Sequence, residues 1–315
     1  MDMTRNPGRL LKFLLLVLLA FVEYACEEPV DPGIEIREPE LVVSSTFFPD
    51  DVVKVRLSAT QPTGGELLIT DIFDATVEIL EGDELVESLV YVSGHDGRPG
   101  NYQGDAFRPQ VGRIYTLLAT RNGYVPFEAE SSIPVATPIT ELKGEIVSTT
   151  SGDNLTIYDF DLIVNYEDPV FEENFYDLRI SQLVIPYYIN SGGDTVRQDA
   201  RAKIVQSPTD AVSGNAAMGE ASILVRDRPN GGGVQTRLQS RLDLTKEILG
   251  RLEAELRTVS PAYYYYHLAF RREGQALPIG LGDPPVNINA IGNASSGVGI
   301  FGGYNSVRQR IALTF

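Results

Sequence analysis

The chain has 315 residues, of which 43% are hydrophobic and 22% are charged, and its formal net charge is −17. This composition is typical of a globular protein with enough residues for two ordinary domains, and it excludes a disordered chain. The acidic balance argues against a nucleic-acid-binding protein and against electrostatic docking on anionic lipid, because both need clustered Lys and Arg.

The N-terminal residues have the layout of a secretory signal that ends at a lipidation site. Three basic residues precede an unbroken apolar run, Phe13 to Val22, and the small Ala25 stands directly before Cys26, the only cysteine. An apolar helix of ten residues is roughly 15 Å long, too short for a stable membrane span. We therefore expect residues 1–25 to be a signal peptide and Cys26 to carry acyl chains such as palmitate. The alternative is an ordinary signal peptide, since Glu23 stands where an aliphatic residue is usual.

Residues 26–38 are expected to form a flexible tether, because Pro29, Pro32, Gly33 and alternating charges leave no apolar face to bury. Short segments with strand-like alternation follow, separated by Gly, Asp, Asn and Pro. Six or seven strands at this spacing predict a β-sandwich of immunoglobulin or transthyretin type over residues 39–135. The segments are Leu41–Phe48, Val52–Ser58, Thr76–Leu80, Glu87–Val92, Ile114–Thr120 and Tyr124–Ile133.

Residues 136–315 are expected to form a second, β-rich domain with one short helix near the C-terminus. Its predicted strands are Ile157–Tyr166, Phe175–Ile185, Ala202–Val205, Ser222–Val225 and Arg237–Leu244. The stretch from Leu252 to Arg257 alternates apolar and charged residues, which favours a strand, although a helix also accommodates it. Ser260-Pro261 is a helix start, a capping hydroxyl followed by proline, so a helix is expected over 261–273. Val307 to Phe315 is expected to be a closing strand.

Four consecutive tyrosines, Tyr263, Tyr264, Tyr265 and Tyr266, lie on this predicted helix and are the candidate binding residues. Successive helical positions are about 100° apart, so at least one ring should point away from any single packing surface. An exposed Tyr favours sugar or protein contacts, since it offers a rigid apolar face with a hydroxyl. The alternative is that neighbouring loops cover all four rings.

The residue types that carry metal and catalytic chemistry are sparse. Asp159 and Asp161 share one face of a predicted strand and form a weak candidate for a calcium site, with a solvated strand face as the alternative. The only histidines are His95 and His267, so no zinc site of His and Cys is available. No Gly-x-Ser-x-Gly elbow accompanies His95, which leaves a hydrolase as the least favoured hypothesis. We expect neither a cofactor nor enzymatic activity.

Four motifs in order resemble one protein family. They are Pro39-Glu40-Leu41-Val42-Val43, Asp74 to Ile79, Ser260-Pro261-Ala262-Tyr263-Tyr264, and Asp283 to Ile288 followed by Gly297 to Tyr304. Together they are similar to an uncharacterised lipoprotein family of Bacteroidota, domain of unknown function 4249. The resemblance implies an envelope lipoprotein, often found with TonB-dependent outer-membrane transporters, and it implies no catalytic residue.

Asp194-Thr195-Val196 matches the Asp-Thr-aliphatic acceptor of Bacteroidota O-glycosylation, so Thr195 is a candidate modification site.

The resemblance also implies a function and a location. We expect a lipoprotein held in the outer membrane through Cys26, exposed on the cell surface or on the periplasmic face. Its expected role is that of a non-enzymatic binding or accessory subunit of a TonB-dependent transporter, in nutrient capture or gating. The alternative is a structural or adhesive surface protein that binds glycan or peptidoglycan.

Overall fold

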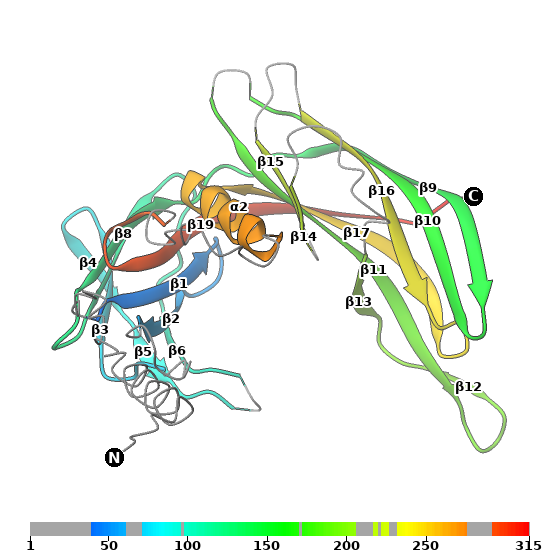
Figure 1. Cartoon of the computed structure of the whole chain (residues 1–315), viewed down its shortest axis with the longest axis horizontal. Helices are drawn as coiled ribbons and strands as arrows, with labels where there is room; N and C mark the ends of the chain where they lie inside the picture. The colour runs from blue at the N-terminus through cyan, green and yellow to red at the C-terminus, as the bar shows by residue number, and fades with distance from the viewer. Residues whose placement is uncertain are drawn as a thin grey trace, which may run out of the picture. The chain divides into compact units, whose positions relative to one another are not determined.

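The computed structural model describes residues 39–60, 71–95, 98–169, 172–205, 217–219, 222–226, 232–275 and 292–314. Over these ranges the chain is mainly β, with a helix, α2 (Pro261–Gln275), near the C-terminus, which confirms the predicted fold class (Figure 1). The predicted signal peptide, the tether and Cys26 lie outside the described residues.

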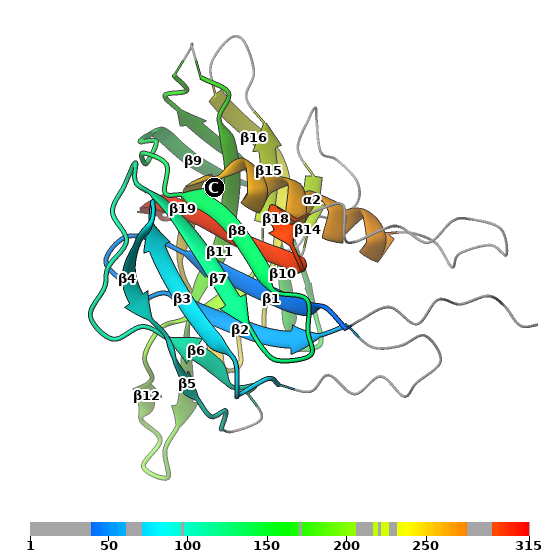
Figure 2. The same ribbon diagram turned by 90° about the vertical axis from the view of Figure 1, so that its left-hand side faces the viewer.

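The first sandwich encloses its core between two sheets. One face is built from β1 (Leu41–Phe47), β2 (Lys54–Ala59), β6 (Asn101–Gln103) and β5 (Val90–Val92). The other is built from β18 (Ala294–Ser296), β8 (Phe127–Ser132), β7 (Ile114–Thr120), β3 (Thr76–Glu81) and β4 (Glu84–Ser88), and Figure 2 shows β8, β7 and β3 side by side. Alternate residues of each strand point inward, such as Leu41 and Val43 from β1 and Leu117 from β7, and all three are fully buried.

The second sandwich has a separate core. One sheet has the order β16 (Gly232–Leu242), β10 (Leu155–Tyr166), β9 (Ile139–Gly152). Opposite it lie β15 (Ser222–Arg226), β11 (Phe175–Ile189) and β17 (Glu247–Val259), with the short strands β14 (Ala217–Gly219), β13 (Arg201–Ile204) and β12 (Thr195–Arg197). Phe160 and Leu162 of β10 meet Leu178, Leu252 and Leu256 in this core. The stretch 252–257 is therefore a strand, and the helical alternative is wrong.

The last strand, β19 (Val298–Ile311), belongs to both sandwiches. Its first half pairs with β1 in parallel, with Val42 opposite Val298, and its second half pairs with β17 antiparallel, with Val259 opposite Tyr304. The boundary suggested by the sequence, after residue 135, falls between β8 and β9, and β19 crosses between the two halves.

Glycines make the passage of β19 sterically feasible. Gly299 has a φ of +123°, and a Cβ there would lie 1.9 Å from the carbonyl oxygen of Val43. A Cβ on Gly303 would lie 2.1 Å from the carbonyl oxygen of Ser132. The glycine-rich segment before the C-terminus therefore lets β19 approach neighbouring backbone more closely than residues with side chains could.

Helix α2 begins at the expected residue and continues two residues past the predicted end. The Tyr263 N–H donates to Ser260 Oγ at 3.3 Å, as the cap predicted from Ser260-Pro261 requires. The helix packs through Tyr263 and Tyr264 against Phe175, Val259 and other apolar residues of β11, β17 and β19. The strands β15, β11, β17, β19, β1 and β2 are hydrogen-bonded in that order into one large sheet, and this contact places the helix on the face of that sheet opposite the second core.

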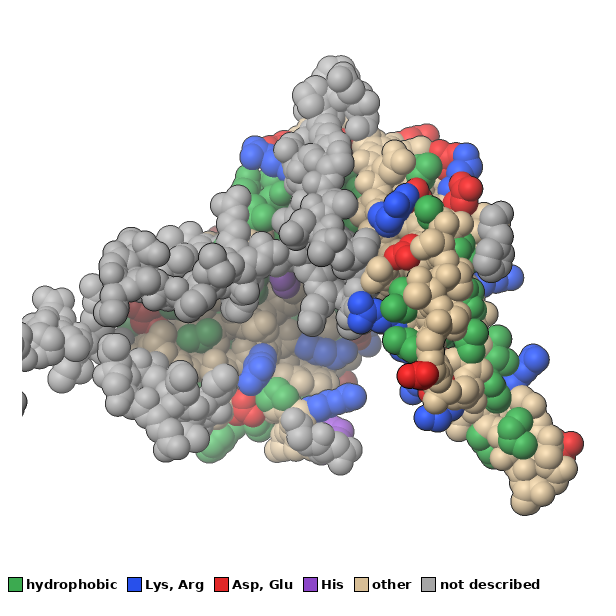
Figure 3. Space-filling view, turned by 45° about the vertical axis from the view of Figure 1, so that its right-hand side comes forward, with side chains coloured by type: hydrophobic (Ala, Val, Ile, Leu, Met, Phe, Trp, Pro, Cys, Tyr) green, Lys and Arg blue, Asp and Glu red, His purple; other side chains and the backbone are tan. Residues whose placement is uncertain are grey.

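A hairpin formed by β11 and β12 extends β11 beyond the core. The amide groups of Gly192 and Asp194 both donate to Asn190 Oδ1, at 2.9 Å each, and so close its turn. Tyr188 and Ile189 are exposed near the turn. Figure 3 shows hydrophobic and basic side chains mixed along the surface that leads down to this hairpin.

Candidate binding face

The tyrosines of α2 divide between core and surface. Tyr263 and Tyr264 are buried, Tyr266 is partly buried, and Tyr265 is 41% exposed. Tyr264 and Tyr265 both pack on the Phe175 ring, with centroid distances of 4.9 and 5.4 Å. Of the four candidate binding residues, Tyr265 is therefore the most exposed, whereas the buried Tyr263 can contact only other residues of the protein.

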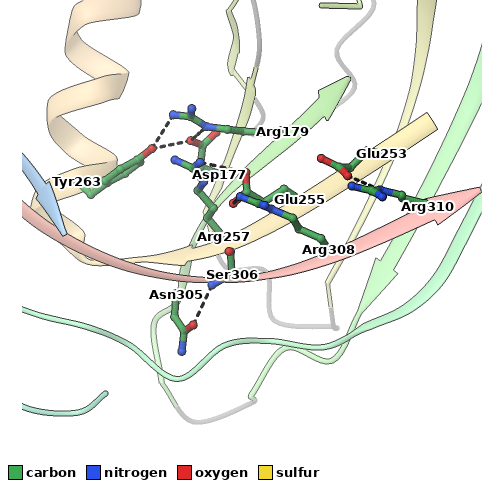
Figure 4. A network of polar contacts seen from close by, with 10 residues as sticks. All are labelled: Asp177, Arg179, Glu253, Glu255, Arg257, Tyr263, Asn305, Ser306, Arg308 and Arg310. Atoms are coloured by element: carbon green, nitrogen blue, oxygen red, sulfur yellow. Dashed lines mark hydrogen bonds and ion pairs between the residues drawn. The ribbon is translucent and has the colours of Figure 1, made fainter. Parts of the chain in front are cut away.

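The hydroxyl of Tyr263 belongs to a partly buried ionic triad with Asp177, which is buried, and Arg179, which is 36% exposed, both of β11. It donates to Asp177 Oδ2 at 2.8 Å and accepts from Arg179 Nη2 at 2.9 Å, while Arg179 Nε donates to the same carboxylate at 2.9 Å (Figure 4). Burial raises the pKa of Tyr263 to about 12, and the nearby charge of Asp177 adds to this effect. For Asp177 burial acts to raise the pKa, but Arg179 and Tyr263 outweigh it, and the pKa is lowered.

The triad is one end of an ordered array on three neighbouring strands. Directly opposed residues of paired strands point to the same face of a sheet, so the register defines rows of side chains. The rows across β11, β17 and β19 are Asp177, Arg257, Ser306; Arg179, Glu255, Arg308; and Ser181, Glu253, Arg310. In the second row a carboxylate stands between two guanidinium groups, which is the arrangement that pairing opposite charges favours.

Glu255 is the centre of the array. Its Oε2 accepts from Arg257 Nη2 at 3.0 Å and its Oε1 from Arg308 Nη2 at 3.1 Å. Burial acts to raise its pKa, but the hydrogen bonds from the two arginines prevail, and the pKa of Glu255 is lowered. Arg257 also lies over the ring of Tyr304, 4.3 Å from its centroid. Glu255 is therefore held ionised, and it fixes the positions of both guanidinium groups.

We call this surface the arginine face. It comprises the carboxylates Asp177, Glu253 and Glu255 and five arginines, Arg179, Arg251, Arg257, Arg308 and Arg310. Arg251 is exposed and adjoins Leu252, which points into the core, so we assign it to this face at the point where the register of β17 against β11 shifts. Five guanidinium groups against three carboxylates give it a formal charge of +2, on a chain whose net charge is −17.

Exposure separates the two signs of charge. The side chains of Asp177 and Glu255 are 1% and 11% exposed, whereas those of Arg308 and Arg310 are 59% and 56% exposed. The carboxylates thus lie beneath the arginines and orient them, and solvent meets mainly guanidinium groups. Such a surface is suited to binding oxyanions, since the arginine fork matches carboxylate, phosphate and sulfate groups.

The calcium candidates Asp159 and Asp161 have protein partners. Asp161 receives two hydrogen bonds from Arg237, at 2.7 and 2.9 Å, and Asp159 accepts from Ser148 and Gln239. In the described part of the chain, no group of three or more His, Cys, Asp or Glu residues is placed to hold a metal ion. The geometry favours a solvated, paired strand face for these two aspartates.

The other candidate residues lie apart from the arginine face. Thr195 opens β12 beside the hairpin turn and is exposed, and His95 is exposed in a loop of the first sandwich. His267 packs on the Tyr263 ring, with 4.3 Å between the centroids. Cys26 lies outside the described residues. Among the described residues, no helix is both long enough and apolar enough to cross a membrane.

A hollow of about 530 Å³ opens at one end of the first sandwich. Its lining is Asp74, Thr76, Thr120, Arg121, Asn122 and Tyr124. Arg121 pairs with Asp74 at 2.7 Å and covers the Tyr124 ring at 4.6 Å, so the charges and the aromatic face of the hollow are already engaged. The arginine face, on which Arg308 and Arg310 are more than half exposed, is the stronger candidate for binding.

The alternation at Glu253, Glu255 and Arg257 predicts a strand but by itself indicates no functional role. A stronger signal was present, because charges also stand two residues apart in Asp177 and Arg179 and in the segment that follows Tyr304. Three strand-like segments with charges at every second position indicate a charged sheet face. What the sequence could not give is the register that brings the three segments together.

Comparison with known proteins gives one family. A family model with the description "Domain of unknown function (DUF4249)" matches residues 27–310 of the chain. Among solved structures, a chain of "Crystal structure of Dpr2 Ig1-Ig2 in complex with DIP-Theta Ig1-Ig3" aligns at 12% identity, over 83% of this chain and 99% of that chain, with a TM-score of 0.19. A likeness this slight supports no argument about fold or function. No curated protein matches the chain.

Proposed function

The chain belongs to the DUF4249 family, and we propose that it is an outer-membrane lipoprotein that binds rather than catalyses. In this proposal acyl chains on Cys26 hold the protein at the cell surface. Its role is that of an accessory subunit which captures a ligand for a TonB-dependent transporter.

The observation that carries the proposal is the arginine face. Binding surfaces gain affinity when their side chains are held in place before the ligand arrives. Arg308 is held by Glu255, and Arg310 forms an ion pair with Glu253. Immobilising a loose surface arginine on binding costs side-chain entropy, whereas these arginines are already positioned by their ion pairs on central strands of a sheet.

The tether supports a role beside a membrane protein. Residues 27–38, between Cys26 and the first described residue, span at most roughly 40 Å when fully extended. That reach would let the folded part stand clear of the lipid headgroups and meet a neighbouring membrane protein while the acyl chains stay in the bilayer. An anchored protein also gains effective concentration toward any partner in the same membrane.

A second candidate function is a structural or adhesive surface lipoprotein that binds glycan or peptidoglycan. The exposed ring of Tyr265 favours it, because tyrosine offers sugars a rigid apolar face together with a hydroxyl. The two candidate functions differ in whether the protein has a stable transporter partner.

The test is extraction of the tagged, full-length protein from its own cells in mild detergent, with partners identified by mass spectrometry. A Cys26→Ser variant is the control, because it should leave the membrane fraction without its partner. A transporter recovered in stoichiometric amount with the wild type alone is the expected result. Recovery of the wild-type protein by itself would overturn the accessory role and favour the second candidate function.

A further inference from the structure

We infer that the arginine face binds an acidic polysaccharide, a chain of sugars that carries carboxylate or sulfate groups at intervals. This inference rests on the proposed binding function and names the class of ligand. It follows from the donors on the face, their spacing and the position of their strands within the sheet.

The outer arginines keep most of their hydrogen-bonding capacity. Among the described residues, Arg308 donates to Glu255 through Nη2 and Arg310 donates to Glu253 through Nε. A guanidinium group has five N–H donors, so each retains donors toward solvent. Arg251 is exposed and has no ion pair with any described residue. The ligand that fits is rich in acceptors and poor in donors, as carboxylate and sulfate groups are.

The spacing indicates a repeating ligand. Arg308 and Arg310 are two residues apart on β19, which places them roughly 7 Å apart along the strand. Arg251 is the next charged residue of β17 beyond Glu253, just past the last pair of β17 with β19, Leu252 with Ile311. A single small anion would bind to one of these arginines, whereas a polymer with charges several ångströms apart can bind to several of them at once.

The position of the strands argues against a peptide ligand. Extended peptides usually bind by adding a strand to a free sheet edge. β17 is paired on both sides, with β11 and with β19, so its backbone groups are already used. A peptide on this face would find side-chain donors but no partners for its own amide groups.

Charge density argues against a nucleic acid. Double-stranded DNA carries one negative charge per roughly 1.7 Å of its axis. A face with a formal charge of +2 on a chain of net charge −17 cannot neutralise that density. A polysaccharide with one charge per sugar or per pair of sugars brings fewer charges to the same length of surface.

The experiment titrates the full-length protein in detergent with polygalacturonate, which carries carboxylates, and with dextran sulfate of low substitution, about one sulfate per sugar, each at low and high salt. Neutral dextran and polyglutamate are the comparison polymers. The expected result is binding of at least one acidic polysaccharide, stronger than binding of either comparison polymer and weakened by salt. A preference for polygalacturonate would assign carboxylate as the recognised group, and a preference for dextran sulfate would assign sulfate.

Three variants locate the binding site. The double substitution Arg308→Gln, Arg310→Gln should weaken binding at least tenfold. Arg251→Gln should weaken it about threefold without changing the melting temperature, because this arginine has no ion pair to lose with any residue that the structure describes. Arg113→Gln is the matched control, since Arg113 is 61% exposed and pairs with Glu81 on the other sandwich, and binding should change less than twofold.

Several results would overturn the inference. They are no binding of either acidic polysaccharide, binding of polyglutamate that is equally tight, or an equal loss of binding in Arg113→Gln. Transporter recovery without polysaccharide binding would remove this inference and leave the accessory role standing. If the protein binds an acidic polysaccharide but is extracted from cells without a transporter, the accessory role is refuted and the inferred class of ligand is retained.

Discussion

Tyr263→Phe tests the partly buried triad that fixes α2 on the large sheet. The substitution removes one oxygen atom and keeps the ring, so packing in the aromatic cluster is unchanged. Asp177 loses the donor at 2.8 Å, and Arg179 Nη2 loses the acceptor at 2.9 Å. The ion pair between Asp177 and Arg179 remains.

The expected loss follows from the burial of these groups. Hydrogen bonds to charged groups contribute about 1.5–3 kcal/mol each, and more when their loss leaves a buried group without a partner. Because Asp177 keeps Arg179, we expect the free energy of unfolding to fall by about 2–3 kcal/mol. For a chain of this size that corresponds to a decrease in melting temperature of roughly 3–5 °C.

The assay is thermal and urea unfolding of the wild type and of two Tyr→Phe variants. Tyr265→Phe is the control, because Tyr265 is 41% exposed on the same helix and its loss should change the free energy of unfolding by less than about 0.5 kcal/mol. If Tyr263→Phe and Tyr265→Phe unfold at the same temperature, the triad does not stabilise the helix and the reasoning is refuted.

Three further predictions address the ionic array, the shared strand and the hairpin. The pKa of Glu255 is lowered in the folded protein, so its contribution to stability is present above the unfolded pKa, near 4.5, and is lost as the pH falls through the folded value. Glu255→Gln should therefore flatten the pH dependence of the free energy of unfolding between pH 5 and 3, measured by denaturation at each pH. An unchanged pH dependence would contradict the role of Glu255 as the ionised centre of the array. Gly303→Ala should cost about 1–3 kcal/mol through its contact with the Ser132 carbonyl, whereas Gly152→Ala, where nothing lies within 4 Å, should be nearly neutral in the same denaturation assay. Thr195→Ala should remove a sugar mass seen by mass spectrometry of the native protein, and a wild-type protein without that mass would exclude modification at the hairpin.

The sequence predicted the fold class because its signals are local. Alternating apolar residues mark β1, β7 and β10, and Ser260-Pro261 marks the start of α2 within one residue. β9 was missed because it is an edge strand with few buried positions, among them Ile139 and Ile146, and many exposed polar ones. Alternation can be read only where one face of a strand is consistently buried.

The arginine face could not be assembled from the sequence, since its contacts are not local. Tyr263 and Asp177 are 86 residues apart, and Arg308 and Glu255 are 53 apart. The crossing of β19 between the sandwiches decides which residues meet, and no spacing in the sequence encodes that register. The four tyrosines are predicted as binding residues, yet Tyr263 holds the helix to Asp177 and Arg179 of β11.

The most direct test of the account is photo-crosslinking in living cells from a crosslinking amino acid placed at position 308 of the lipidated protein, with position 113 as the control. If the arginine face is the binding surface, position 308 should give a discrete crosslinked product with an envelope partner or an acidic polysaccharide, reduced by Arg310→Gln, and position 113 should not. Equal products from both positions, or products from position 113 alone, would contradict the assignment of this face as the binding surface.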